Sequence, residues 1–182
     1  MKTIRRITRL IAFGALICFS GASVGNAAFT TVGHQVTITV PEVLSLTADT
    51  GNFTLTFSDW VSGSETDQKT VVYSLESNDM GQADNDTAMN ANIDFAYDRI
   101  DLKAKVGAYT KVAGNTEVAA IDPDFVTIGT ANVAIAKKAN TTAGSDGKLL
   151  KGTLPITYKG VATGDVPSGP QTHLLFITLT TR

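Results

Sequence analysis

The chain contains very little cysteine, histidine or tryptophan. Its 182 residues include one cysteine, Cys18, two histidines, His34 and His173, and one tryptophan, Trp60. A single cysteine excludes an intrachain disulfide and a zinc site built from several thiolates. Catalysis by a nucleophile and a base would have to use one of the two histidines, and no Gly-x-Ser-x-Gly, phosphate-binding loop or His-Glu-x-x-His sequence accompanies them. We therefore expect a protein that is not an enzyme.

The sequence also lacks an apolar run of about 20 residues, the length that a helix needs to cross a bilayer. An apolar run from Leu10 to Phe19 follows four basic residues and precedes small residues that end at Ala27 and Ala28. This arrangement predicts a secretory signal peptide over residues 1–27, which includes Cys18. We expect the mature chain to have no transmembrane segment and to work in the periplasm, at the cell surface or outside the cell.

Basic residues are few in the expected mature chain. Four of the 15 basic residues lie in the predicted signal peptide, which leaves 11 against 17 acidic residues and a net charge of about −6. An acidic surface repels phosphate groups and anionic lipid headgroups. We therefore expect neither nucleic acid nor an anionic membrane as a partner.

Helical periodicity is nearly absent, whereas apolar and polar residues alternate along many short segments. Alternation with period 2 is typical of strands with one buried and one solvated face, and residues such as Gly, Asn, Asp and Pro separate the segments. The sequence predicts one all-β domain over residues 28–182, an antiparallel β-sandwich of immunoglobulin-like or jelly-roll-like architecture. The expected strands are 36–40, 53–57, 71–75, 93–97, 100–106, 125–128, 154–158 and 175–179.

Two segments leave the secondary structure open. Residues 77–92 are rich in Asn, Asp, Ala and Met and predict a loop or a helical turn. Residues 131–139 fit a short strand or a helical turn, because alanine supports helix formation.

Three groups of residues suggest ligand binding, and each has a plainer alternative. Asp84 and Asp86 supply closely spaced oxygens that calcium could use, but without EF-hand spacing they are more typical of solvated turn carboxylates. His34 and His173 each stand two residues before an alternating strand, so parallel first and last strands would bring them together. Two imidazoles alone do not complete a zinc site. Trp60 could form a platform for a sugar ring, although we favour a place in the core.

Alternating strands are expected close to both ends of the mature chain. Residues 31–40 form a strand rich in β-branched residues, and residues 175–179 form a strand near the last residue of the sequence. A terminal strand can complete its own sheet or be added to the sheet of a neighbour. The apolar side chains that would gate such assembly are Val36, Ile38, Val40, Leu175, Ile177 and Leu179.

With its signal peptide, alternating N-terminal strand, Thr- and Ala-rich sandwich and alternating C-terminal strand, the chain resembles the secreted pilin-like and immunoglobulin-like subunits of bacterial surface fibres. The resemblance implies that a terminal strand of one subunit fills an incomplete sheet of the next, so that burial of Val36, Ile38 and Val40 joins subunits. It does not extend to the cysteine pair and the tyrosine near the C-terminus that chaperone-assembled pilins commonly carry.

We therefore expect a secreted structural or adhesive surface protein that associates with itself, or with another surface protein, by β-strand addition. Two alternatives stay open. The same residues could form the first and last strands of an ordinary monomeric sandwich. The protein could instead be a carbohydrate- or calcium-binding module that uses Trp60 or the loop from Asp84 to Asp86. No cofactor other than calcium is expected.

Overall fold

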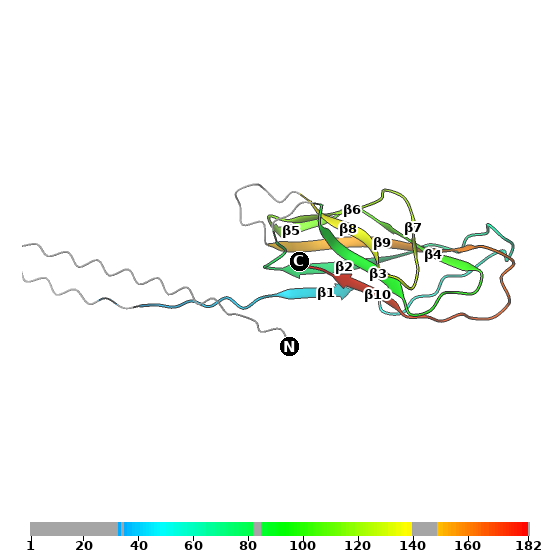
Figure 1. The fold of residues 1–182 in the computed structure, drawn as a ribbon, viewed down its shortest axis with the longest axis horizontal. Coiled ribbons are helices and arrows are strands. Elements are labelled where there is room, and N and C mark those ends of the chain that lie inside the picture. The colour runs from blue at the N-terminus through cyan, green and yellow to red at the C-terminus, as the bar shows by residue number, and fades with distance from the viewer. Residues whose placement is uncertain (1–32, 34, 82–84, 140–148, 182) are drawn as a thin grey trace, which may run out of the picture. The chain divides into compact units, whose positions relative to one another are not determined.

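The computed structural model describes residues 33, 35–81, 85–139 and 149–181 (Figure 1). The secondary structure of these residues consists of β-strands without an α-helix, so the predicted all-β class is confirmed. None of the described segments is a helix long and apolar enough to cross a membrane. The expected signal peptide lies outside the described residues. The strands are β1 (Leu44–Ala48), β2 (Lys69–Ser77), β3 (Thr87–Ile93), β4 (Ile100–Val106), β5 (Thr110–Gly114), β6 (Glu117–Ala120), β7 (Val126–Ile128), β8 (Val133–Ala139), β9 (Leu150–Ala162) and β10 (Leu175–Leu179).

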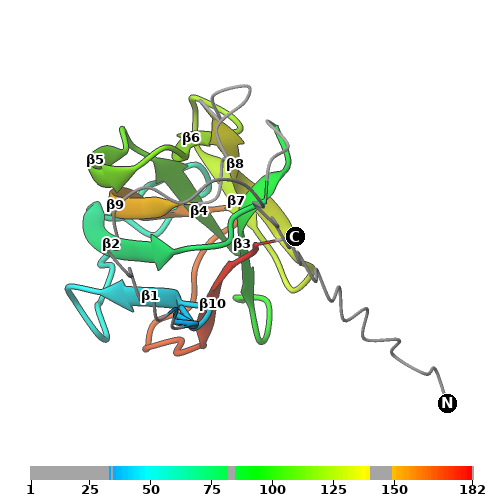
Figure 2. The same ribbon diagram turned by 90° about the vertical axis from the view of Figure 1, so that its left-hand side faces the viewer.

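The strands form two antiparallel sheets that pack together (Figure 2). In the larger sheet the order is β1-β2-β9-β4-β7, and β5 pairs with the part of β9 that β4 leaves free. In the smaller sheet the order is β10-β3-β8-β6. The predicted antiparallel β-sandwich is therefore confirmed. The edge strands are β1, β7 and β5 in the larger sheet, and β10 and β6 in the smaller one.

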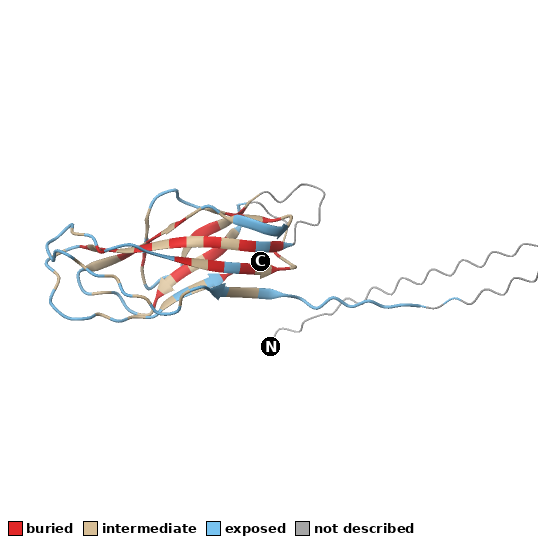
Figure 3. Ribbon diagram, turned by 180° about the vertical axis from the view of Figure 1, so that it is seen from behind, coloured by how far each residue is buried: buried red, intermediate tan, exposed pale blue. Residues whose placement is uncertain are grey.

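β9 lies at the centre of the larger sheet, between β2 on one side and β4 and β5 on the other. Buried residues alternate with less buried ones along it (Figure 3). Leu154, Ile156 and Tyr158 are fully buried. Pro155 is tolerated in this central strand because its backbone faces the junction between β4 and β5, where its carbonyl accepts a hydrogen bond from Gly107 N at 2.8 Å. The missing N–H of the proline therefore interrupts no regular ladder.

Two tyrosines, one from β2 and one from β9, meet in the core. The hydroxyl oxygens of Tyr73 and Tyr158 are 2.9 Å apart and share a hydrogen bond, and the ring of Phe53 stacks on Tyr158 with centroids 5.2 Å apart. Burial raises the pKa of both phenol groups above the ordinary value of 10.0. Both groups therefore stay neutral and able to hold the hydrogen bond.

Several expected strands are confirmed. β4 and β10 have the predicted bounds, 100–106 and 175–179, and β2, β7 and β9 overlap the predictions 71–75, 125–128 and 154–158. Residues 131–139 contain strand β8 and not a helical turn. Residues 77–92, for which we expected a loop or a helical turn, contain most of β3.

Other expected strands are not found in the described residues. The prediction for 93–97 is wrong because β3 ends at Ile93, where Asp94 Oδ1 accepts hydrogen bonds from the backbone N atoms of Phe95 at 2.8 Å and Leu174 at 2.9 Å. In segment 53–57 only Phe57 forms a bridge, to Thr66. Residues 36–40 belong to no strand of this chain.

Candidate functional site

β1 and β10 come together along one side of the sandwich, which we call the open side (Figure 2). β1 is the last strand of the larger sheet, and β10 is the last strand of the smaller one. The start of β1 lies at the same end of the sandwich as the end of β10, because Leu44 pairs with Ser77 and nearby Gly81 lies against the carbonyl of Thr181. The two strands therefore run in opposite directions (Figure 1).

β10 leaves one row of backbone groups without a strand partner among the described residues. Asp94 N donates to Leu174 O at 3.0 Å, and Thr180 N donates to Ala88 O at 2.8 Å, so the even-numbered residues bond to β3. In an antiparallel ladder the intervening residues direct their N–H and C=O groups to the other edge. These odd-numbered residues, whose backbone faces the open side, are Leu175, Ile177 and Leu179.

β10 is also apolar on both faces, which is unusual for a strand at the edge of a sheet. On the inner face, Leu175 and Ile177 are half-buried and pack against the core, and Leu179 is buried. On the outer face Phe176 is exposed, and so is Leu174 just before the strand. An edge strand with apolar side chains on both faces and free backbone groups is a template for another strand.

β1 adds a second incompletely covered edge to the open side. Asn78 N donates to Val43 O, and Asp49 N donates to Val72 O. The odd-numbered residues of β1 therefore direct their backbone groups to β2. The backbone of Leu44 and Leu46 therefore faces the open side. Leu46 packs against the core, whereas Leu44 is exposed.

Residues 35–40, which we call the arm, expose the apolar side chains that we expected in the first strand. The exposed fractions are 78% for Val36, 84% for Ile38 and 75% for Val40. Residues 1–39 and residues 40–182 are separate units by their internal contacts. The strand paired with β10 is β3, so the parallel pairing of first and last strands that the zinc hypothesis requires is absent from the described residues. The assembly role of the arm stays a prediction.

Asn78 holds the residues that directly follow the arm in the sequence. Its side-chain Oδ1 accepts a hydrogen bond from Val43 N at 2.8 Å, and its Nδ2 donates to Pro41 O at 2.7 Å. Its backbone N donates to Val43 O at 3.2 Å. Because Asn78 directly follows β2, these bonds hold Pro41 and Val43 at the end of the sandwich where β10 finishes.

Trp60 is not part of the core, so our favoured interpretation of this residue is wrong. The side chain is 62% exposed, because the chain leaves the sheet after the single bridge at Phe57. The loop is nevertheless well held: Trp60 O accepts a hydrogen bond from Val166 N at 2.9 Å, and Trp60 N donates to Asp59 Oδ1 at 2.7 Å. The indole is therefore presented to solvent from an ordered backbone.

The two metal hypotheses remain predictions. His173 Nδ1 lies 3.5 Å from Asp94 Oδ1, and its ring meets Tyr97 edge-on with centroids 4.4 Å apart, while His34 lies outside the described residues. Asp86 is exposed, and Asp84 lies outside the described residues. In the part of the chain that the structure describes, no three His, Cys, Asp or Glu side chains are grouped as a metal ion would need.

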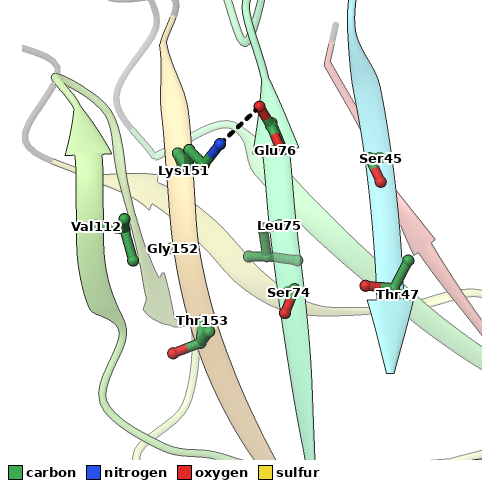
Figure 4. A pocket seen from close by; sticks show the side chains of 9 residues that line it. All are labelled: Ser45, Thr47, Ser74, Leu75, Glu76, Val112, Lys151, Gly152 and Thr153. Atoms are coloured by element: carbon green, nitrogen blue, oxygen red, sulfur yellow. Dashed lines mark hydrogen bonds and ion pairs between the residues drawn. The ribbon is translucent and has the colours of Figure 1, made fainter. Parts of the chain in front are cut away.

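A shallow hollow of about 190 Å³ lies on the outer face of the larger sheet, across β1, β2, β9 and β5 (Figure 4). The two ionisable side chains in its lining are Glu76 and Lys151, which form an ion pair with Oε1 and Nζ 3.1 Å apart. The other polar side chains are the hydroxyls of Ser45, Thr47, Ser74 and Thr153. This lining has neither an imidazole nor a pair of carboxylates that could serve as base and acid.

Neither the protein-family models nor the curated proteins give a match to this chain. The functional assignment therefore depends on the geometry of the open side. Sequence reasoning named the inner face of β10 but missed Leu44, Leu174 and Phe176. One signal was present, because apolar residues at the consecutive positions 174–176 are typical of a strand that is covered on both faces.

Proposed function

We propose that the protein is a secreted structural subunit of a surface assembly, in which the arm of one copy adds as a strand to the open side of the next. The observation that carries the proposal is that apolar side chains recur at every second residue both in the arm and in β10. The arm exposes three apolar side chains at period 2, and β10 has apolar side chains with the same period beside a free edge. Secretion and surface localisation belong to the proposal and are supported by the predicted signal peptide.

The position of Pro41 favours antiparallel addition to β10. In an antiparallel pair, residues directly opposite each other share a face, and at alternate positions they exchange two hydrogen bonds. The arm's three apolar residues would then face the core and bond to β10, while Pro41, which has no N–H, would point away. If the arm instead paired parallel to β10, with its three apolar side chains still facing the core, the backbone groups of Thr37, Thr39 and Pro41 would point toward β10. The proline could not donate a hydrogen bond there.

An arm cannot add antiparallel to β10 of its own chain. Asn78 holds Pro41 at the end of the sandwich where β10 finishes. If the arm folded back from that point, it would follow β10 in the same direction and pair with it in parallel. Antiparallel addition therefore requires the arm of a second copy. The register that overlaps all three apolar residues places Val40 opposite Leu175, Ile38 opposite Ile177 and Val36 opposite Leu179.

The size distribution of the purified protein tests this proposal. The protein expressed from the full sequence should form polymers in light scattering and negative-stain microscopy. A variant that lacks residues 29–40 should stay monomeric and folded, because every described strand begins after residue 43. A full chain that is monomeric at all concentrations would refute strand addition between subunits. An unfolded deletion variant would instead mean that the arm is part of its own sandwich.

Carbohydrate binding at Trp60 is a second candidate function. The observation that favours it is the exposed indole on an ordered loop, since an aromatic ring offers a large apolar face for stacking. A glycan array with the natural protein and a Trp60→Ala variant tests it. Binding that disappears in the variant, at an unchanged melting temperature, would support this function. An array without any bound glycan would exclude it for the sugars presented.

A further inference from the structure

We infer that consecutive subunits also meet end to end, with Val43 and Leu44 of the donor packed on Phe95 and Leu174 of the acceptor. This inference rests on the proposed strand addition. It names a second contact surface, which strand addition alone does not require, and it commits to a second copy of this chain as the partner.

The short connection between the arm and β1 limits how far apart two joined sandwiches can lie. Three residues separate Val40 from β1, which begins at Leu44, so these two Cα atoms can be at most about 14 Å apart. Asn78 holds Pro41 and Val43 against the donor's sandwich, which reduces the free length further. With Val40 opposite Leu175, the donor's end must therefore lie next to the acceptor's end where β10 begins.

That end of the acceptor carries apolar side chains that its own sandwich leaves uncovered. Phe95 is 68% exposed and Leu174 is 62% exposed. The two residues belong to adjoining chain segments, because Asp94 N donates to Leu174 O at 3.0 Å. The ring of His173, one residue before Leu174, has its centroid 6.4 Å from that of Phe95. Phe95 and Leu174 therefore present two exposed apolar side chains close to the first residue of β10.

The donor presents a matching apolar pair at the start of β1. Val43 and Leu44 are both exposed in the isolated chain, and they follow the arm directly. The connection that brings them to the acceptor spans at most about 14 Å, so they lie close to the end of the acceptor where β10 begins. Contact between this pair of the donor and the exposed Phe95 and Leu174 of the acceptor would bury four apolar side chains. Strand addition by itself would leave all four exposed to water.

Disulfide trapping tests this contact, because Cys18 is the sole cysteine in the sequence and lies in the predicted signal peptide. The double variant Val43→Cys/Phe95→Cys should give a ladder of covalent oligomers on non-reducing gels after mild oxidation. An internal bridge is excluded, since the two positions lie at opposite ends of the sandwich and a disulfide needs Cα atoms within about 7 Å. The matched control is Val43→Cys/Ile121→Cys. Ile121 is exposed directly after β6, the strand at the other edge of the smaller sheet, and three strand spacings, about 14 Å in all, separate β6 from β10.

A ladder from the first pair and none from the control supports the end-to-end contact. Polymers in light scattering without a ladder overturn the contact and leave strand addition standing. Monomers without polymers refute strand addition itself, and with it this contact. As a second measurement, Phe95→Asp should raise the concentration needed for polymers by about tenfold, whereas Ile121→Asp should leave it unchanged. Equal effects of the two substitutions would also overturn the contact.

Discussion

Replacing Ile38 by aspartate should weaken assembly by at least about tenfold. Ile38 is 84% exposed in the isolated chain, and antiparallel addition would bury it opposite Ile177 of the next copy. Burial of such a side chain contributes about 1.5–3 kcal/mol. Its loss lowers an association constant by about 10- to 150-fold. A carboxylate in the same apolar position adds a desolvation cost, so about tenfold is the lower bound.

Thr39→Asp is the matched control, because it adds the same charge one residue along the arm, where the side chain would face solvent. A surface substitution of this kind changes the free energy by about 0.5 kcal/mol or less. The critical concentration for polymers, measured by light scattering over a dilution series at constant ionic strength, compares the two variants. Equal shifts would attribute the effect to charge repulsion and not to burial on one face. No shift in either variant would refute the role of the arm.

Three further predictions concern the sandwich itself. Tyr158→Phe leaves the buried hydroxyl of Tyr73 without its partner and should lower the unfolding free energy by about 1–3 kcal/mol in urea titrations. The double variant with Tyr73→Phe should recover part of this loss, because neither hydroxyl is then left unpaired. Losses of the two substitutions that simply add would contradict the pairing. Gly152→Ala should lower the unfolding free energy by about 1–3 kcal/mol, because the added methyl would collide with the ring of Tyr109 and the carbonyl of Thr110, and an unchanged melting temperature would refute this. Burial and the Glu117 carboxylate raise the pKa of Tyr109 from 10.0 to about 12, so the folded state retains this proton and loses stability relative to the unfolded state as the pH rises from 10.0 to about 12. The Tyr109→Phe variant should lack that part of the alkaline loss, and identical pH profiles of unfolding would contradict it.

The strands that the sequence predicts best are those whose alternation is strong and uninterrupted. In β4, Leu102, Ala104 and Val106 alternate with Asp101, Lys103 and Lys105, and the burial follows the same period. In β10 the burial also alternates, with Leu175, Ile177 and Leu179 turned inward, although the outward Phe176 is apolar. In both strands the inward positions are apolar at every second residue, so the local sequence is sufficient to set the bounds.

Other strands could not be predicted because their pattern depends on partners far away in the sequence. In β3, the consecutive residues Ala88 and Met89 are both buried, and the register against β8 shifts on either side of Met89. Such an irregularity breaks the period-2 signal. In β8, alanines that favour a helix in isolation are held in a strand between β3 and β6, and Lys138 is buried there with its Nζ 3.0 Å from Thr181 O. Tertiary pairing therefore overrides local propensity.

The candidate site is predictable only in its parts. Alternation alone finds two sets of apolar residues: Val36, Ile38 and Val40 in the arm, and Leu175, Ile177 and Leu179 in β10. Which edge of which sheet is free depends on the strand order, and that order is set by non-local pairs such as β2 with β9 and β3 with β8. The polar residue that holds the base of the arm, Asn78, carries no distinguishing sequence signal, because asparagine after a strand is common in turns.

A hairpin between the arm and β1 is the arrangement that competes with assembly, and Val43 is the residue that opposes it. The loop Pro41-Glu42-Val43 has proline where a type I turn prefers it, but a three-residue hairpin loop needs a left-handed residue at its third position. Val43 is β-branched and does not have a positive φ. Both its N and its O are bonded to Asn78, which keeps it extended.

Val43→Gly should therefore convert polymers into monomers. Once the loop can close, addition within the chain has an effective concentration in the millimolar range, so it should exceed addition between chains at micromolar protein by about 1000-fold. The variant should be monomeric, with an arm that resists protease and a raised melting temperature. Val43→Ala removes the same side-chain contact without allowing a positive φ, so it should still form polymers, at a higher concentration, and keep a protease-sensitive arm. If glycine and alanine act alike, the hairpin does not compete, and the reason that the arm stays exposed must be sought elsewhere than at Val43.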